Sequence, residues 1–149
     1  MADLRELYQE VVIDHSKRPR NFHKLEGANR TAKGYNPLCG DKIALYLKIR
    51  DGRVEDASFE GSGCAISTAS ASIMTEAVKG KTAGEAESLF KNFHELVTTG
   101  ASANSGAALG KLEVFSKVGD YPARVKCATL AWHTLRSLLE GGEDVISTE

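Results

Sequence analysis

The stretch that decides the fold is Ile43–Phe59, IALYLKIRDGRVEDASF, in which two strand-like runs flank Asp51-Gly52. The first run, Ile43–Arg50, is rich in residues that favour strands, and Val54–Phe59 alternates between apolar and other side chains. Asp-Gly is a strong signal for a two-residue hairpin turn, because such turns need positive φ angles. The sequence predicts an antiparallel pair of strands here, with Arg30–Tyr35 as a third strand.

Helices are expected on both sides of these strands in the sequence. Apolar spacing and end signals predict them over residues Leu4–Val12, Ala65–Val78, Thr82–Val97 and Arg124–Glu140. The third begins with a capping box, Thr82-Ala83-Gly84-Glu85. Strands that are followed by a cluster of helices indicate an α+β fold, with a small antiparallel sheet of about three strands and helices packed on one face. We expect one domain over residues 1–149, with a disordered tail at 143–149.

Composition excludes several classes of function. A chain of 149 residues with 42% hydrophobic residues can bury roughly 70% of its unfolded surface without disulfides. The formal net charge of −1 leaves no broad basic field for nucleic acid. The N-terminus, MADLRELYQE, has neither the basic nor the apolar part of a secretion signal, and no stretch has membrane-spanning length. We therefore expect a cytoplasmic protein that binds neither nucleic acid nor membrane.

The three cysteines are predicted to meet at one end of the sheet. Cys39 lies in the loop that enters the hairpin, Cys64 follows the second hairpin strand, and Cys127 lies in the first turn of the last predicted helix. Asp41 adds a carboxylate two residues after Cys39. Three thiolates and a carboxylate suit a tetrahedral zinc site or the mounting of an iron-sulfur cluster. The alternative is that each cysteine is a small buried hydrophobic residue.

The segment around Cys64, GSGCAISTAS from Gly61 to Ser70, places the thiol between flexible glycines and a helix that starts near Ala65. Unpaired N–H groups at the helix start would stabilise negative charge on the sulfur. A thiolate is both the nucleophilic and the metal-binding form of cysteine, so this segment alone leaves both roles open.

Three motifs resemble a known family: Pro37–Asp41 (PLCGD), Gly61–Ser67 (GSGCAIS) and Arg124–Ala128 (RVKCA). They are similar, in the same order, to the three cysteine motifs of the IscU/NifU family of iron-sulfur cluster assembly proteins. The resemblance implies the α+β fold of that family and a cysteine desulfurase as partner. It also implies a metal or cluster site built from Cys39, Asp41, Cys64 and Cys127.

Three departures from the housekeeping scaffolds of the family resemble its SufU-type branch. Lys126 replaces a histidine before the third cysteine, extra sequence lies around Thr98–Val118, and Tyr121–Arg124 replaces a Leu-Pro-Pro segment. The SufU branch implies a zinc-dependent sulfurtransferase that takes persulfide sulfur from a SufS-type desulfurase and serves a downstream Suf-type cluster scaffold. The alternatives are a scaffold on which an iron-sulfur cluster is assembled and, third, a structural zinc domain.

The resemblance also suggests how the residues divide their work. A sulfur relay requires one zinc ligand to be released, and Cys39 is the expected sulfur acceptor because Pro and Gly bound its loop. Arg124 and Lys126 would offset the negative charge of the ligands or contact the partner; the alternative is an ordinary solvated basic face. The histidines, His15, His23, His94 and His133, follow no ligand pattern, and we expect most of them at the surface.

Overall fold

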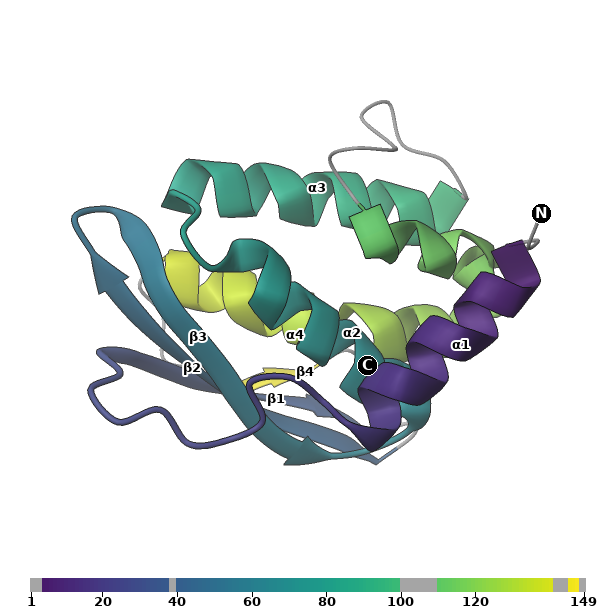
Figure 1. Cartoon of the computed structure of the whole chain (residues 1–149), viewed down its shortest axis with the longest axis horizontal. Helices are drawn as coiled ribbons and strands as arrows, with labels where there is room; N and C mark the ends of the chain where they lie inside the picture. Colours follow the sequence, from purple (N-terminus) through teal and green to yellow (C-terminus); the bar gives the residue numbers. More distant parts are fainter. Residues whose placement is uncertain (1–3, 38–39, 100–109, 141–144, 148–149) are drawn as a thin grey trace.

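The computed structural model describes residues 4–37, 40–99, 110–140 and 145–147. In chain order its elements are α1 (Leu4–Lys17), β1 (Arg30–Asn36), β2 (Asp41–Arg50), β3 (Arg53–Ser62), α2 (Ala65–Val78), α3 (Ala83–Thr99), the 3₁₀ helix η2 (Gly110–Asp120), α4 (Pro122–Leu139) and β4 (Val145–Ser147). The predicted α+β class is confirmed, since the first three strands form an antiparallel sheet and helices cover one of its faces (Figure 1).

The sheet has the order β3-β2-β1-β4. Its hairpin turns at Asp51 and Gly52, whose φ angles of 53° and 76° are the positive values that the sequence predicts for this dipeptide. The tail expected to be disordered over 143–149 departs from that expectation at Val145–Ser147, which form β4 parallel to β1. Without β4, the edge of β1 away from β2 would leave backbone groups unpaired, and β-branched residues such as Val145 and Ile146 favour a strand there.

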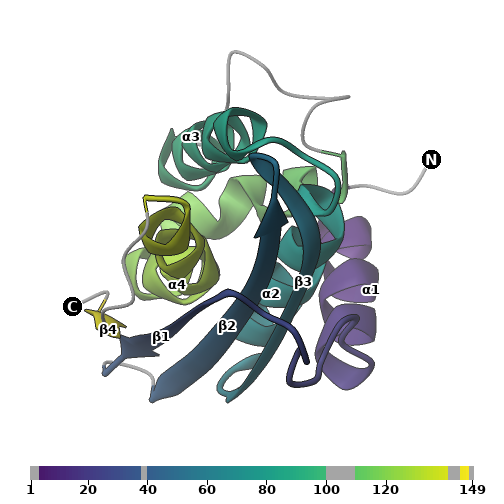
Figure 2. The same ribbon diagram turned by 90° about the vertical axis from the view of Figure 1, so that its left-hand side faces the viewer.

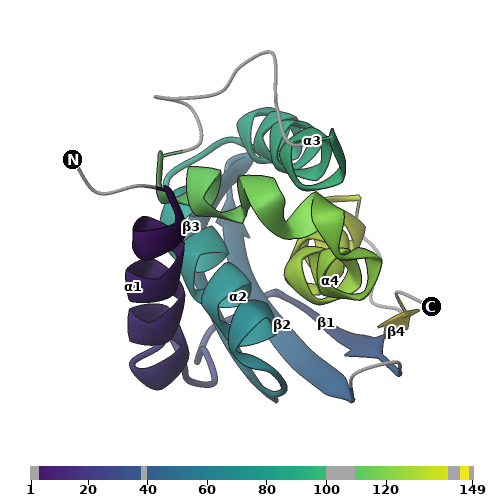
Figure 3. The same ribbon diagram turned by 90° about the vertical axis from the view of Figure 1, so that its right-hand side faces the viewer.

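The helices form the second layer of the molecule. Figures 2 and 3 show α2 and α4 side by side against the sheet, with α1 beside α2 and with α3 and η2 on the side away from the strands. Gly34 lets α4 approach β1 closely, because a Cβ atom at this position would overlap Thr134 Oγ1. This packing places the start of α2 and the early part of α4 near the end of the sheet.

The core is centred on Trp132 of α4, which is fully buried. Its ring stacks on Phe93 of α3 with centroids 4.6 Å apart, and Phe93 meets Phe115 of η2 edge-on at 5.7 Å. The indole N–H donates to Ser70 Oγ at 3.1 Å, so the polar atom of the ring is satisfied inside the core. Through Phe115, the long interval between Cys64 and Cys127 contributes to the core; residues 100–109 of that interval lie outside the described residues.

The starts of α3 and α4 can be compared with the sequence predictions. The capping box is confirmed, since Thr82 N–H donates to Glu85 Oε1 at 3.0 Å and Glu85 N–H donates to Thr82 Oγ1 at 3.1 Å. The last helix begins at Pro122, two residues earlier than predicted, because proline suits the first helical position. None of the described helices combines the length and apolar character needed to cross a membrane.

Candidate metal centre

Three of the four predicted ligands meet at one end of the sheet. Single ligand atoms of Asp41, Cys64 and Cys127 all lie within 4.8 Å of one another. Asp41 is the first residue of β2, Cys64 is the N-cap of α2, and Cys127 lies on α4, so three separate elements build the cluster. Asp41 is completely buried, Cys127 is 3% exposed, and Cys64 is half-buried. The fourth predicted ligand, Cys39, lies outside the described residues.

Cys64 is held by hydrogen bonds to the first turn of α2 and to Asp41. Its sulfur accepts the Ser67 backbone N–H at 3.4 Å, which makes the thiol the cap of α2, as the sequence suggested. Its own backbone N–H donates to Asp41 Oδ1 at 2.8 Å. The Cys64 sulfur lies 4.0 Å from Asp41 Oδ2. The carboxylate is therefore tied to the start of α2 while one of its oxygens faces the thiol.

The two glycines before Cys64 are required by close approach rather than by turn geometry. A Cβ atom at Gly61 would overlap the backbone carbonyl oxygen of Lys42, and one at Gly63 would overlap Asp41 Oδ1. The Gly63 position would also be 3.1 Å from the Cα and the Cβ of Asp41. Glycine at these positions lets the chain that leads to α2 lie directly on the start of β2.

Sequence reasoning missed one buried polar residue at the centre, Asn36. It is the last residue of β1, pairs with Asp41 in register and has no exposed surface. Its side-chain amide donates to Asp41 Oδ2 at 3.1 Å and to Cys127 Sγ at 3.6 Å. The signal was present in the strand alternation, because Ala32, Gly34 and Asn36 all face inward.

The ligand atoms fit the size of a zinc site. With zinc–sulfur bonds of about 2.3 Å, sulfur ligands of a tetrahedral zinc lie about 3.8 Å apart. The cluster, whose atoms lie within 4.8 Å, needs only small inward movements to reach that spacing. Thiolate and carboxylate are both zinc ligands. The arrangement of Asp41, Cys64 and Cys127 would supply three of the four ligands of such an ion.

The position of Cys127 differs from the prediction. Because α4 begins at Pro122, Cys127 is its sixth residue and lies in the second turn, beyond the first four N–H groups, which lack intrahelical acceptors. The helix start therefore does not act on this thiol as it does on Cys64. Arg124 is exposed, with its guanidinium 4.5 Å from the centroid of the Tyr121 ring, and Lys126 is half-buried.

His23 and His94 are exposed, as expected, and His133 is half-buried, whereas His15 is only 1% exposed. Its Nδ1 lies 2.7 Å from Ser72 Oγ, and burial lowers the pKa of this histidine. Its position three residues after Val12 on the buried face of α1 was the available signal. Burial also lowers the pKa of His133. Neither histidine belongs to the Asp41–Cys64–Cys127 cluster.

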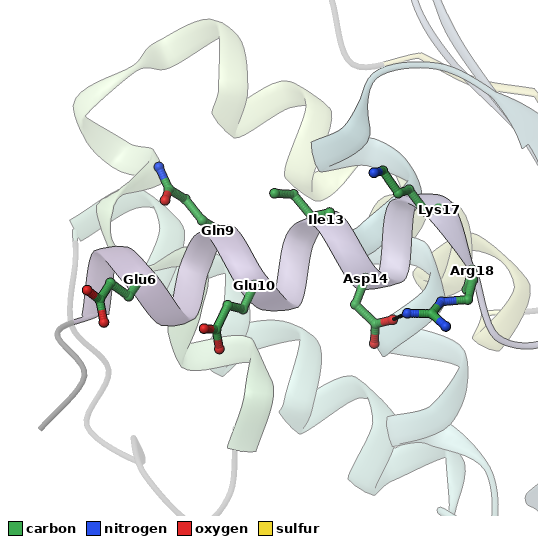
Figure 4. Close-up of a pocket in the computed structure, with 7 residues that line it drawn as sticks. All are labelled: Glu6, Gln9, Glu10, Ile13, Asp14, Lys17 and Arg18. Atoms are coloured by element: carbon green, nitrogen blue, oxygen red, sulfur yellow. Dashed lines mark ion pairs between the residues drawn. The ribbon is translucent and has the colours of Figure 1, made fainter.

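An open hollow lies on the outer face of α1, where charges of both signs surround the exposed Ile13 (Figure 4). Two arginines that follow α1 form ion pairs with a carboxylate of the helix. Arg18 and Arg20 both contact Asp14, with nitrogen–oxygen distances of 3.3 Å and 2.7 Å. The hollow contains neither a thiol nor an imidazole, so it does not compete with the cysteine cluster as a metal centre.

Known proteins of similar sequence include one sulfurtransferase and one scaffold protein. The zinc-dependent sulfurtransferase SufU of Bacillus subtilis is 45% identical over 134 residues, which cover 90% of each chain. The iron-sulfur cluster assembly scaffold protein IscU of Streptococcus pyogenes is 42% identical over 94% of this chain and 87% of its own.

A crystal structure of a putative iron-sulfur cluster assembly scaffold protein for the SUF system, from Fervidobacterium islandicum, has the same fold. Its TM-score is 0.83 at 37% identity, and the match covers 91% of this chain and 98% of the other. Residues 7–128 match the family described as the NifU-like N-terminal domain. This chain therefore belongs to the NifU-like N-terminal domain family.

Proposed function

We propose that this protein is a zinc-dependent sulfurtransferase of iron-sulfur cluster assembly, which accepts persulfide sulfur from a SufS-type cysteine desulfurase. The observation that carries the proposal is the convergence of Asp41, Cys64 and Cys127 within 4.8 Å. The 45% identity to a protein named as a zinc-dependent sulfurtransferase supports the same reading. A cytoplasmic location suits this function, because reducing conditions keep thiols available.

In this proposal Asp41, Cys64 and Cys127 hold zinc together with Cys39. Bound zinc keeps cysteine thiols deprotonated without redox chemistry of its own. Asp41 and the start of α2 hold Cys64 by the hydrogen bonds described above. Cys127 is fixed by its place within α4. These anchors make Cys64 and Cys127 the permanent ligands and leave Cys39 as the residue that exchanges.

Cys39 is the proposed sulfur acceptor because the anchors described above hold Cys64 and Cys127 in place. It lies between Pro37 and Gly40, and Gly40 has a φ of 72°, a conformation that other residues rarely adopt. The Cys39 thiolate attacks the terminal sulfur of the desulfurase persulfide, a new sulfur–sulfur bond forms, and the desulfurase cysteine leaves as a thiolate. The sulfur then passes to a Suf-type cluster scaffold. In this scheme Arg124 and Lys126 offset ligand charge or contact the desulfurase.

A second candidate function is a scaffold on which an iron-sulfur cluster is assembled. It is favoured by the relative named as a scaffold at 42% identity, and three cysteine thiolates also suit a cluster. Lys126 and the longer interval that contains η2 favour the sulfurtransferase, because the scaffold branch carries a histidine and a shorter interval.

The test is sulfide release by a SufS-type desulfurase with cysteine and a reductant, with and without this protein. We expect faster release in the presence of the zinc-loaded wild-type protein and no acceleration with the Cys39→Ser variant. A colourless protein with about one zinc per chain is expected as well. A brown protein that carries acid-labile sulfide and leaves desulfurase turnover unchanged would favour the scaffold instead.

A further inference from the structure

The amide of Asn36 occupies a position that packing alone does not explain. The residue is completely buried at the end of β1, beside Asp41 and Cys127. Its Oδ1 atom has no hydrogen-bond partner among the described residues. A buried polar atom without a partner lowers stability, so an apolar residue of similar size would suit a purely structural role better.

Both hydrogen bonds from the Asn36 amide go to predicted metal ligands. The Nδ2 group donates to Asp41 Oδ2 at 3.1 Å and to Cys127 Sγ at 3.6 Å. The other carboxylate oxygen, Asp41 Oδ1, accepts the backbone N–H of Cys64 at 2.8 Å. The carboxylate is thereby fixed from two sides, by the end of β1 and by the start of α2.

We propose that Asn36 is a positioning residue of the metal centre, which holds Asp41 and Cys127 in the arrangement that zinc requires. This inference rests on the proposed function in one respect, since it takes the centre to bind zinc. The amide links ligands from β2 and α4, two elements whose ligand atoms have to stay close in the absence of the ion.

The chemistry of an amide suits this task. Cysteine thiolates and the Asp41 carboxylate bring more negative charge than one divalent ion neutralises, and the Asn36 N–H groups direct positive dipole ends at two of these ligands. The amide is neutral and has no thiol or carboxylate, so it orients the ligands without competing strongly for zinc. Hydrogen-bonding partners of metal ligands commonly contribute 10–100-fold to metal affinity.

The test compares zinc affinity in Asn36→Leu, Asn36→Ala and the wild-type protein by competition with a chromophoric chelator. Asn36→Leu removes the donor and keeps a side chain of similar size, and Asn36→Ala removes the donor with a smaller side chain. We expect both variants to bind zinc about 10–100-fold more weakly. The visible spectrum of the cobalt-substituted protein should also change in both variants, because it reports on the arrangement of the ligands.

Asn29, the residue directly before β1, provides a matched control near the opposite end of that strand. Its side chain donates to the Ile49 carbonyl at 2.7 Å and accepts the Ile49 N–H at 2.9 Å, so it also joins β2 to the chain that forms β1. Asn29→Leu should lower the free energy of unfolding while it leaves zinc affinity and the cobalt spectrum unchanged. Asn36 variants should differ from it by their loss of zinc affinity.

The possible outcomes separate this inference from the proposed function. Suppose that the wild-type protein binds one zinc and that both Asn36 variants have zinc affinities within about threefold of the wild-type value. The positioning role is then wrong and the proposed function stands. If Asn36→Leu does not fold, the affinity of Asn36→Ala decides in the same way. If the wild-type protein binds no zinc, the proposed function fails and the role of Asn36 fails with it.

Discussion

Replacing Gly63 with alanine should disturb the metal centre although the residue is exposed. A substitution at an exposed position usually changes the free energy of unfolding by less than about 0.5 kcal/mol. The added Cβ atom would overlap Asp41 Oδ1 and would lie 3.1 Å from the Cα and Cβ atoms of the same residue. Since two of these three contacts are with the Cα and Cβ atoms, a rotation of the Asp41 side chain alone cannot relieve them.

The expected magnitude follows from the contacts that must give way. Forcing an extra methyl group into such a place typically lowers the free energy of unfolding by about 1–3 kcal/mol. Moving Asp41 also weakens the 2.8 Å hydrogen bond from Cys64 N–H to the carboxylate, and bonds of this type contribute about 1.5–3 kcal/mol. Because 1.4 kcal/mol corresponds to a factor of ten, we expect zinc affinity to fall about tenfold or more.

The assay is urea unfolding together with zinc competition, and Gly84→Ala is the matched control. A Cβ atom at Gly84, in the first turn of α3, would meet only Thr82 Oγ1 at 4.0 Å. This control should therefore raise the free energy of unfolding by about 0.4–1 kcal/mol and leave zinc affinity unchanged. A Gly63→Ala protein with the stability and zinc affinity of the wild type would refute the close approach between the chain before α2 and Asp41.

Three further predictions concern the ligands, a buried histidine and a helix cap. Cys39→Ser should abolish sulfur acceptance but retain much of the zinc, whereas Cys64→Ser and Cys127→Ser should lower zinc affinity and stability together. Metal analysis and alkylation of the persulfide test this prediction. Persulfide found mainly on Cys127 would contradict it. Burial lowers the pKa of His15 below its ordinary value of 6.5, so the unfolded chain binds more protons and stability should fall as the pH drops below about 6.5. His15→Gln should flatten this dependence in urea unfolding of the zinc-loaded proteins, and equal slopes would show that His15 does not cause it. Thr82→Ala should cost about 1 kcal/mol of unfolding free energy through loss of the capping box, and an unchanged unfolding midpoint would count against that cap.

The parts of the fold that follow from local patterns were predictable. The hairpin at Asp51-Gly52 and the helix Ala65–Val78 appear where the sequence indicates them, because turn chemistry and helical spacing act over a few residues. The 3₁₀ helix η2 was not predicted, since its burial depends on contacts such as Phe115 with Phe93. The pairing of β4 with β1 likewise joins residues far apart in the chain.

The part of the candidate site that consists of cysteines and a carboxylate was predictable from the sequence. The motifs that contain Asp41, Cys64 and Cys127 indicated a common site, and the structure brings these three together. Asn36 was missed because an asparagine at a strand end usually indicates a turn, and only the fold shows that its amide faces two ligands. The place of Cys127 on its helix was wrong by about half a turn, because proline moved the helix start to residue 122.

Native mass spectrometry of the purified protein, before and after brief incubation with a SufS-type desulfurase and cysteine, tests the central claim most directly. Both the bound metal and any transferred sulfur add resolvable mass to the same intact chain. We predict one zinc ion in the starting protein and one added sulfur atom after incubation, with the zinc retained and with no added sulfur on the Cys39→Ser variant. A starting protein that carries iron with inorganic sulfide, or a zinc protein that gains no sulfur, would contradict the account.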